Sequence, residues 1–78
     1  MQAQRLRQIR NRNALTQTQL GAAAGMAASA VSGIERGFVR PSAARAHAIA
    51  EALGVAVEDV EELREAVRYH ARRGRDDG

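Results

Sequence analysis

The sequence predicts an all-α fold in which five helices form one domain. Its 78 residues suffice for a single small core, because a chain of this length buries only roughly 60% of the surface that its unfolded state exposes. Alanine is abundant, proline occurs once and β-branched runs are few, which favours helices over strands. Three glycines follow apolar segments at positions where helices commonly end: Gly25, Gly37 and Gly54. We expect one domain over residues 1–73 and a disordered tail over residues 74–78.

Composition narrows the class of protein. The chain has no cysteine, which excludes a disulfide framework and a thiolate metal site. Its charged N-terminal segment lacks the apolar core of a signal peptide, and no stretch approaches the ~20 apolar residues that span a bilayer. We therefore expect a cytoplasmic protein that does not bind a membrane.

Charge is divided unevenly along the chain. The segment from Met1 to Arg45 holds seven arginines and one acid, Glu35, whereas the remainder holds five arginines and eight acids. A basic half of this kind is typical of a surface that meets a polyanion. All twelve basic residues are arginine, which suits bidentate contact with phosphate.

The first helix is predicted over Ala3 to Arg12. Leu6 and Ile9 lie one turn apart in this segment and are expected to face inward. The outward positions are then arginines: Arg5, Arg7 and Arg12.

The second helix is predicted over Gln17 to Ala24 and the third over Ala28 to Arg36. Thr16 and Gln19 have the spacing of a capping box, in which each side chain accepts from the other residue's backbone N–H. The third helix has no such start. Ala27 stands where a polar cap would be expected, an omission that typically costs ~1 kcal/mol.

The fourth helix is predicted over Ala43 to Leu53, capped by Ser42, and the fifth from about Val57 to Arg73. The fifth begins with acids and ends with arginines, as the helix dipole prefers. Its apolar stripe steps by three and four residues and has two interpretations. In the first interpretation the stripe packs against the chain's own core. In the second it pairs with a second copy in a dimer. The two interpretations are compatible with each other. The stripe consists of Val60, Leu63, Val67 and His70.

Two short helices joined through Gly25 have the spacing of a helix-turn-helix over residues 16–36, in which the second helix of the pair enters the major groove. The residues along this region resemble the Cro/C1 repressor family, also called Xre-type regulators. The resemblance extends from about Arg5 to Val60 without a gap. It is carried by Leu15-Thr16-Gln17, Leu20, Gly25, Val31-Ser32, Ile34-Glu35-Arg36-Gly37, Pro41-Ser42 and Leu53-Gly54-Val55.

The resemblance implies a five-helix repressor-like fold that binds double-stranded DNA. It assigns Gln17 to a phosphate contact that also braces the reading helix, and Arg40 to a backbone contact from the following loop. Its base-reading positions fall on Ala28, Ser29, Ser32 and Gly33, and further DNA-facing positions on Thr18, Ala27 and Arg36. Many members pair an arginine of the first helix with the glutamate of the Ile-Glu-Arg-Gly segment. Here these two residues are Arg10 and Glu35. Glu35 is also the only acid in the basic half.

The predicted reading helix departs from the family pattern. Repressors usually carry Gln, Arg, Asn or Thr here, because such side chains discriminate base edges. This chain has alanines, Ser29, Ser32 and Gly33. Small side chains would let the helix sit deeper, with phosphate contacts setting the register and groove shape contributing to selectivity. Gly21 is expected to be small because the two helices of the motif approach closely.

Other chemistry has little support. His47 and His70 lie in different helices without acid or thiol partners at metal-ligand spacing. Ser29, Ser32 and Ser42 lack a base and an orienting acid. We expect no enzyme activity, metal, cofactor or small-molecule ligand.

The sequence is compatible with two alternative functions. The first is a transcriptional regulator, a repressor acting as a homodimer on a palindromic operator whose half-sites lie about 34 Å apart. Phage repressor, restriction controller and antitoxin remain open within it. The second is a protein-interaction adaptor, or an antitoxin-like partner-binding protein, that keeps the fold with weak base readout and docks through its acidic C-terminal helix.

Overall fold

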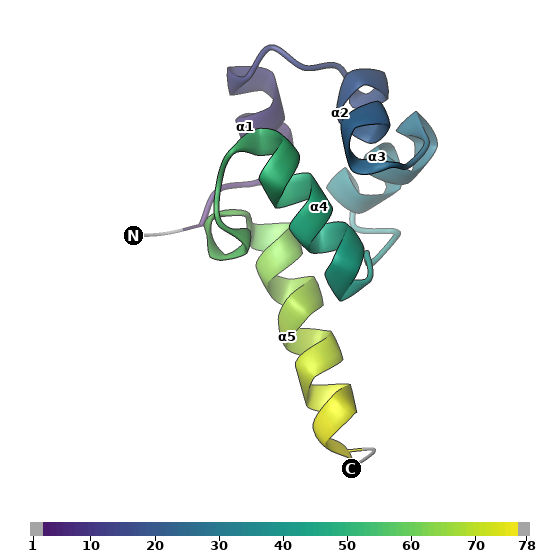
Figure 1. The fold of residues 1–78 in the computed structure, drawn as a ribbon, viewed down its shortest axis with the longest axis vertical. Helices are drawn as coiled ribbons and strands as arrows, with labels where there is room; N and C mark the ends of the chain where they lie inside the picture. Colours follow the sequence, from purple (N-terminus) through teal and green to yellow (C-terminus); the bar gives the residue numbers. More distant parts are fainter. Residues whose placement is uncertain (1–2, 77–78) are drawn as a thin grey trace.

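The computed structural model describes residues 3–76 and consists of five α-helices (Figure 1). Within these residues no β-strand forms, and the fold class predicted from the sequence is confirmed. A single 3-10 turn, η1, precedes the last helix. The elements in order are α1 (Leu6–Arg12), α2 (Gln17–Ala24), α3 (Ala28–Glu35), α4 (Ala43–Leu53), η1 (Val57–Asp59) and α5 (Glu61–Asp76).

Helices α2 and α4 begin and end where local sequence signals placed them. The Thr16 hydroxyl accepts from the Gln19 backbone N–H at 3.0 Å, and the Gln19 side chain accepts from the Thr16 N–H at 2.9 Å. The Ser42 side chain caps α4 by accepting from the Arg45 N–H at 3.1 Å. Both helices end on a left-handed glycine, Gly25 after α2 and Gly54 after α4. Helix α3 has no side-chain cap, as Ala27 predicted.

Helix α1 begins at Leu6, so the predicted start at Ala3 was wrong. The residues before it are extended, and Gln4 pairs with the chain that enters α5. The Gln4 N–H donates to the Asp59 carbonyl at 3.0 Å, and the Gln4 carbonyl accepts from the Glu61 N–H at 2.8 Å. The Glu62 carboxylate then accepts from the Leu6 N–H at 2.8 Å, so an acid of α5 satisfies the first turn of α1.

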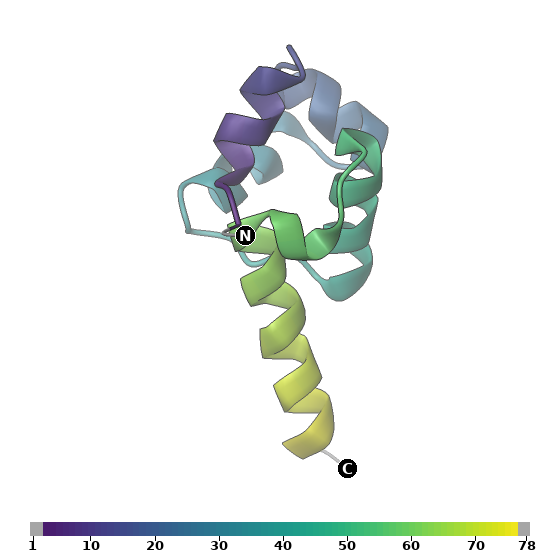
Figure 2. The ribbon, with the colours of Figure 1, turned by 90° about the vertical axis from the view of Figure 1, so that its left-hand side faces the viewer.

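The last helix begins at Glu61, so the predicted start near Val57 was also wrong. Val60 has extended dihedrals, φ −116° and ψ 118°, which separate η1 from α5. The helix continues to Asp76, three residues into the segment expected to be a tail, while residues 77–78 lie outside the described part. Its C-terminal half projects away from the other helices (Figures 1 and 2).

The core lies where α1, α2, α3 and α4 surround the start of α5. Val60 and Leu63 are fully buried in it, and Val67 packs against its edge. The apolar stripe of the last helix therefore packs against its own chain, and Val60 and Leu63 are not available to a partner. The other large side chains that are fully buried are Leu6, Ile9, Leu20, Val31, Ile34 and Ile49. Among the described residues, no helix is long and apolar enough to cross a membrane.

Candidate nucleic-acid interface

Helices α2 and α3 approach each other closely at the turn that joins them. A Cβ placed on Gly21 would lie 2.4 Å from the Met26 carbonyl oxygen, which real Cβ atoms essentially never do. The Met26 N–H donates to the Gly21 carbonyl at 2.8 Å, and Gly25 holds the turn with φ 74°. Arg45 of α4 donates to the Gly25 carbonyl and so ties the turn to the next helix. The small residue expected at position 21 is a packing requirement.

An ion pair between Arg10 and Glu35 joins α1 to α3, as predicted from the sequence. The Arg10 Nε donates to Glu35 Oε2 at 2.6 Å and its Nη2 to Oε1 at 3.2 Å. The Arg10 side chain is 11% exposed and that of Glu35 only 5%. A third arginine nitrogen, Nη1, donates to the Leu15 carbonyl at 2.8 Å. The guanidinium thus links α1, the loop before α2, and α3.

Gln17 joins the same cluster. Its Nε2 donates to Glu35 Oε1 at 3.1 Å, which connects the first residue of α2 to the last residue of α3. The two helices of the motif are therefore locked together by a side-chain bond as well as by the turn. The bracing role that the resemblance gave to Gln17 has a direct structural basis in this bond.

The protonation of this cluster follows from its surroundings. Burial favours the neutral form of Glu35, but hydrogen bonds from Arg10 and Gln17 and the charges of Arg10 and Arg7 together hold the Glu35 pKa below its usual value. The hydrogen bond to Glu35 raises the pKa of Arg10 despite its burial. The pair is ionised across the physiological pH range.

The residues expected to face DNA lie on α2, on α3 or directly beside α3, and they differ in exposure. Ser29, Ala27 and Thr18 are exposed, and Ala28, Ser32 and Gln17 are half-buried. A polar hollow beside them is lined by Gln17, Ser32, Arg36 and Arg7 above the buried ion pair. The structure therefore brings together one residue from the start of α2, one from the middle of α3 and two exposed arginines.

Gly33 is buried, so its predicted place among the base-reading residues was wrong. A Cβ built on Gly33 would lie 2.6 Å from Val39 Cγ2. Its carbonyl accepts from the Phe38 N–H at 2.8 Å and the Val39 N–H at 3.1 Å. Position 33 is small because the loop after α3 folds over it.

That loop is fastened to α5. The Arg40 guanidinium lies 3.9 Å from the centroid of the Tyr69 ring, and His70 Nε2 lies 3.0 Å from the Pro41 carbonyl oxygen. His70, a dimer candidate from the sequence, is thus half-buried against its own chain, whereas His47 is exposed on α4. Sequence reasoning gave no role to Tyr69, because a lone aromatic near the C-terminus does not indicate what it stacks on.

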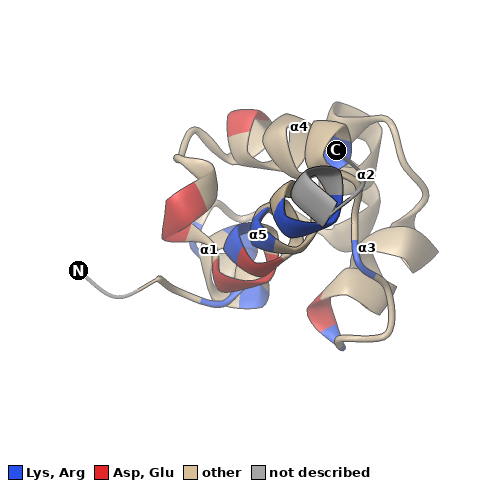
Figure 3. Ribbon diagram, turned by 90° about the horizontal axis from the view of Figure 1, so that it is seen from below, with Lys and Arg blue, Asp and Glu red and all other residues tan. Residues whose placement is uncertain are grey.

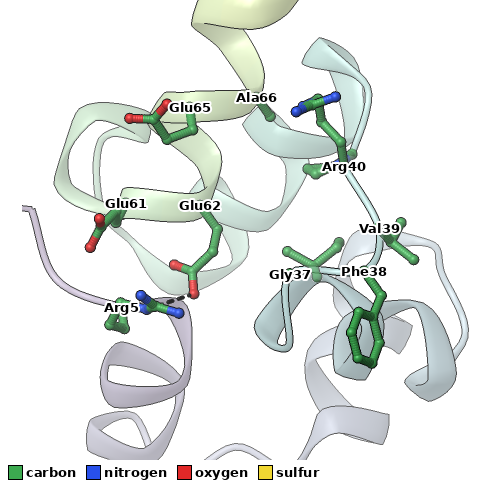
Figure 4. A pocket seen from close by; sticks show the side chains of 11 residues that line it. Arg5, Gly37, Phe38, Val39, Arg40, Glu61, Glu62, Glu65 and Ala66 are labelled. Carbon is green, nitrogen blue, oxygen red and sulfur yellow. Dashed lines mark ion pairs between the residues drawn. The ribbon is translucent and has the colours of Figure 1, made fainter.

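Phe38 was also missed. Its side chain is 77% exposed, the largest exposure of any sizeable apolar residue described, and the Arg36 guanidinium lies 5.2 Å from its ring centroid. The ring lies in the loop just after α3, at the rim of a hollow that α5 closes on the far side (Figure 4).

The family model described as "Helix-turn-helix domain" matches residues 3–63 of the chain. The chain belongs to the helix-turn-helix domain family. The match covers α1 to α4, η1 and the first residues of α5, so it contains the whole of the polar face described above. No curated protein matches the chain significantly, and no solved structure does either.

Within this helix-turn-helix domain, α2 and α3 form the motif and α1 supports it through Arg10. The fold is that of a DNA-binding regulator, and its exposed polar face is formed by the motif itself. Most of α5, including Tyr69 and the arginines beyond it, lies outside the family match.

Proposed function

We propose that the protein is a Cro/C1-type transcriptional regulator that represses by binding double-stranded DNA as a homodimer on a palindromic operator. The observation that carries this proposal is the lock between Arg10, Glu35 and Gln17. It fixes α3 against α1 and α2 through charge-assisted hydrogen bonds within 3.2 Å, and so holds the exposed side of α3 in one orientation. A helix that enters a major groove must be held rigidly, because each base contact depends on register.

Phosphate docking is supported by the polar hollow between α1, α2 and α3. Arg7 and Arg36 line it and have no ion-pair partner among the described residues, while the one acid at its base is neutralised by Arg10. The local charge is therefore positive. We assign Gln17, Arg7 and Arg36 to one stretch of DNA backbone.

Arg40 is proposed to contact the backbone on the other side of α3. Arg40 is exposed and its guanidinium is stacked on Tyr69, which restricts the side chain. A restricted arginine loses less conformational entropy when it binds a phosphate than a free one does.

Base readout is proposed to rest on Ser29 and Ser32, with Ala27, Ala28 and Thr18 packing against the groove. Serine hydroxyls bond to either base edge and alanine methyls contact thymine methyls, so the side chains discriminate weakly. Sequence-dependent groove shape would then supply much of the selectivity.

A second candidate is the adaptor, which docks a protein partner through the acidic start of α5. The small side chains of α3 favour it, and so do the exposed acids of η1 and α5. Under either proposal the protein works in the cytoplasm without metal, cofactor or small-molecule ligand.

Selection of duplexes from a pool of genomic fragments separates the two candidates. The regulator should enrich one or a few palindromes and bind them at least ~10³ times more tightly than random duplex at physiological salt. Uniform weak binding that vanishes with salt would contradict sequence-specific regulation and favour the adaptor.

A further inference from the structure

Four charged residues form one stripe on the solvent face of α5. Glu61, Glu65, Arg68 and Arg72 are spaced by four, three and four residues, which keeps them within about 60° around a helix that turns about 100° per residue. Leu63 lies on the opposite, buried side. Glu65, Arg68 and Arg72 are exposed and Glu61 is half-buried.

Figure 3 shows the acidic and the basic segments of α5, and Figure 4 shows the two acids of the stripe. Acidic segments of α5 lie near α1 and basic segments follow toward the C-terminus (Figure 3). Glu61 and Glu65 point to the same side of the helix, whereas Glu62 turns toward Arg5, with which it pairs at 3.2 Å (Figure 4).

No stripe residue forms an ion pair among the described residues, although Glu61 and Glu65 line one hollow with Arg5 and Arg40. The ion pairs among the described residues are Arg5–Glu62 and Arg10–Glu35, and neither includes a stripe residue. Like charges stand four apart in it, Glu61 with Glu65 and Arg68 with Arg72, whereas the opposite charges Glu65 and Arg68 stand three apart, a spacing that favours the helix. The helix dipole favours acids first and arginines last, and three further charged residues of α5, Glu62, Arg64 and Arg73, lie outside the stripe.

The same order of charges is self-complementary about a twofold axis. If two α5 helices pack antiparallel with the axis beside the Ala66–Val67 peptide, Glu61 faces the partner's Arg72 and Glu65 faces the partner's Arg68. Symmetry doubles each contact, which gives four ion pairs in an isologous interface. A parallel arrangement would place each charge against its own copy.

We propose that this stripe is the dimer contact and that its occupant is the antiparallel α5 of a second copy. The proposal rests on the homodimer of the proposed function and deepens it by naming the surface. The C-terminal half of α5 projects beyond the other helices, so a second copy reaches it without displacing the core (Figure 2). Exposed ion pairs are individually weak and screened by salt, so the dimer should be weak, should be seen only at tens of micromolar or above, and should dissociate as ionic strength rises.

Cysteine cross-linking tests the orientation, because the chain has no cysteine of its own. Positions 61 and 72 differ by eleven residues, an axial offset of about 16 Å. A thiol cross-linker shorter than that offset should join Glu61→Cys to Arg72→Cys in a mixture and should join neither variant to itself. Self-linking of each variant, without the mixed product, would overturn the antiparallel contact.

Charge exchange tests the register. Glu65→Arg or Arg68→Glu alone should weaken the dimer at least about tenfold in sedimentation equilibrium, because attractions become repulsions. The double variant Glu65→Arg/Arg68→Glu should restore it, since position 65 faces the partner's position 68. Glu51→Arg is the matched control, because it makes the same charge change on an exposed position of α4.

The outcomes distinguish a failure of this dimer contact from a failure of the proposed homodimer itself. A wild-type dimer unaffected by either single reversal would overturn the stripe and leave the homodimer standing. A wild-type chain that remains monomeric at tens of micromolar and low ionic strength, with and without the selected duplex, would overturn both.

Discussion

The Arg10–Glu35 pair should carry a large part of the stability of this domain, and Glu35→Ala measures how much. The substitution removes a carboxylate whose side chain is 5% exposed and which accepts three hydrogen bonds, two from Arg10 and one from Gln17. It leaves the Arg10 guanidinium, 11% exposed, without its counter-charge. Breaking one partner of a buried pair typically costs about 3–5 kcal/mol.

That loss is large for a domain of this size. At roughly 0.05–0.15 kcal/mol per residue, 78 residues give an unfolding free energy of about 4–12 kcal/mol. In a domain this small, each kcal/mol lowers the melting temperature by roughly 4–8 °C, so Glu35→Ala should melt at least about 12 °C below wild type or be unfolded at 25 °C. Thermal unfolding followed by far-UV circular dichroism measures the shift.

Two further variants make the result interpretable. Glu51→Ala removes an exposed acid of α4 and should leave the melting temperature nearly unchanged. Arg10→Met/Glu35→Leu removes both charges at once and should recover most of the stability, because no uncompensated charge remains. A Glu35→Ala melt that matches the Glu51→Ala melt would refute the reasoning.

Three further predictions concern pH, packing and DNA contact. The pKa of Glu35 lies below its usual value of 4.5 in the folded state, so its stabilisation is complete above the unfolded pKa and is lost as pH falls through the folded pKa; urea titrations should show this loss in wild type, and an equal loss in Arg10→Met/Glu35→Leu would assign it to other groups. Gly21→Ala places a Cβ 2.4 Å from the Met26 carbonyl oxygen and should destabilise the domain by about 1–3 kcal/mol, whereas a variant as stable as wild type in the same titration would show that the turn relaxes freely. Ser29→Ala should reduce discrimination between related duplexes, and Arg40→Ala should weaken all duplexes about equally and lower the salt slope by about one unit; equal losses on selected and random duplex for Ser29→Ala would contradict its reading role.

Elements with local sequence signals were predicted correctly. The Thr16 and Gln19 capping box, the Ser42 cap and the left-handed glycines Gly25 and Gly54 act within one turn of chain, so spacing alone places the ends of α2 and α4. The Arg10–Glu35 pair was predicted from the family resemblance, and the presence of a single acid in the basic segment supported it.

The errors arose where distant parts of the chain meet. Helix α1 starts late and α5 is interrupted at Val60 because Gln4 pairs with that residue from the other end of the sequence. The apolar stripe of the last helix showed which side is buried but not what covers it. Gly33 was assigned by resemblance, and only the fold shows that Val39 closes over it.

The central claim is that α3 and the start of α2 are the surface that binds DNA. The most direct measurement is a titration of the isotope-labelled protein with duplex DNA, followed through its backbone amide resonances. We predict the largest shifts at Gln17, Ser29 and Ser32, with smaller shifts in the loop at Arg40. Shifts concentrated on the acidic start of α5, with α3 unchanged, would contradict the claim.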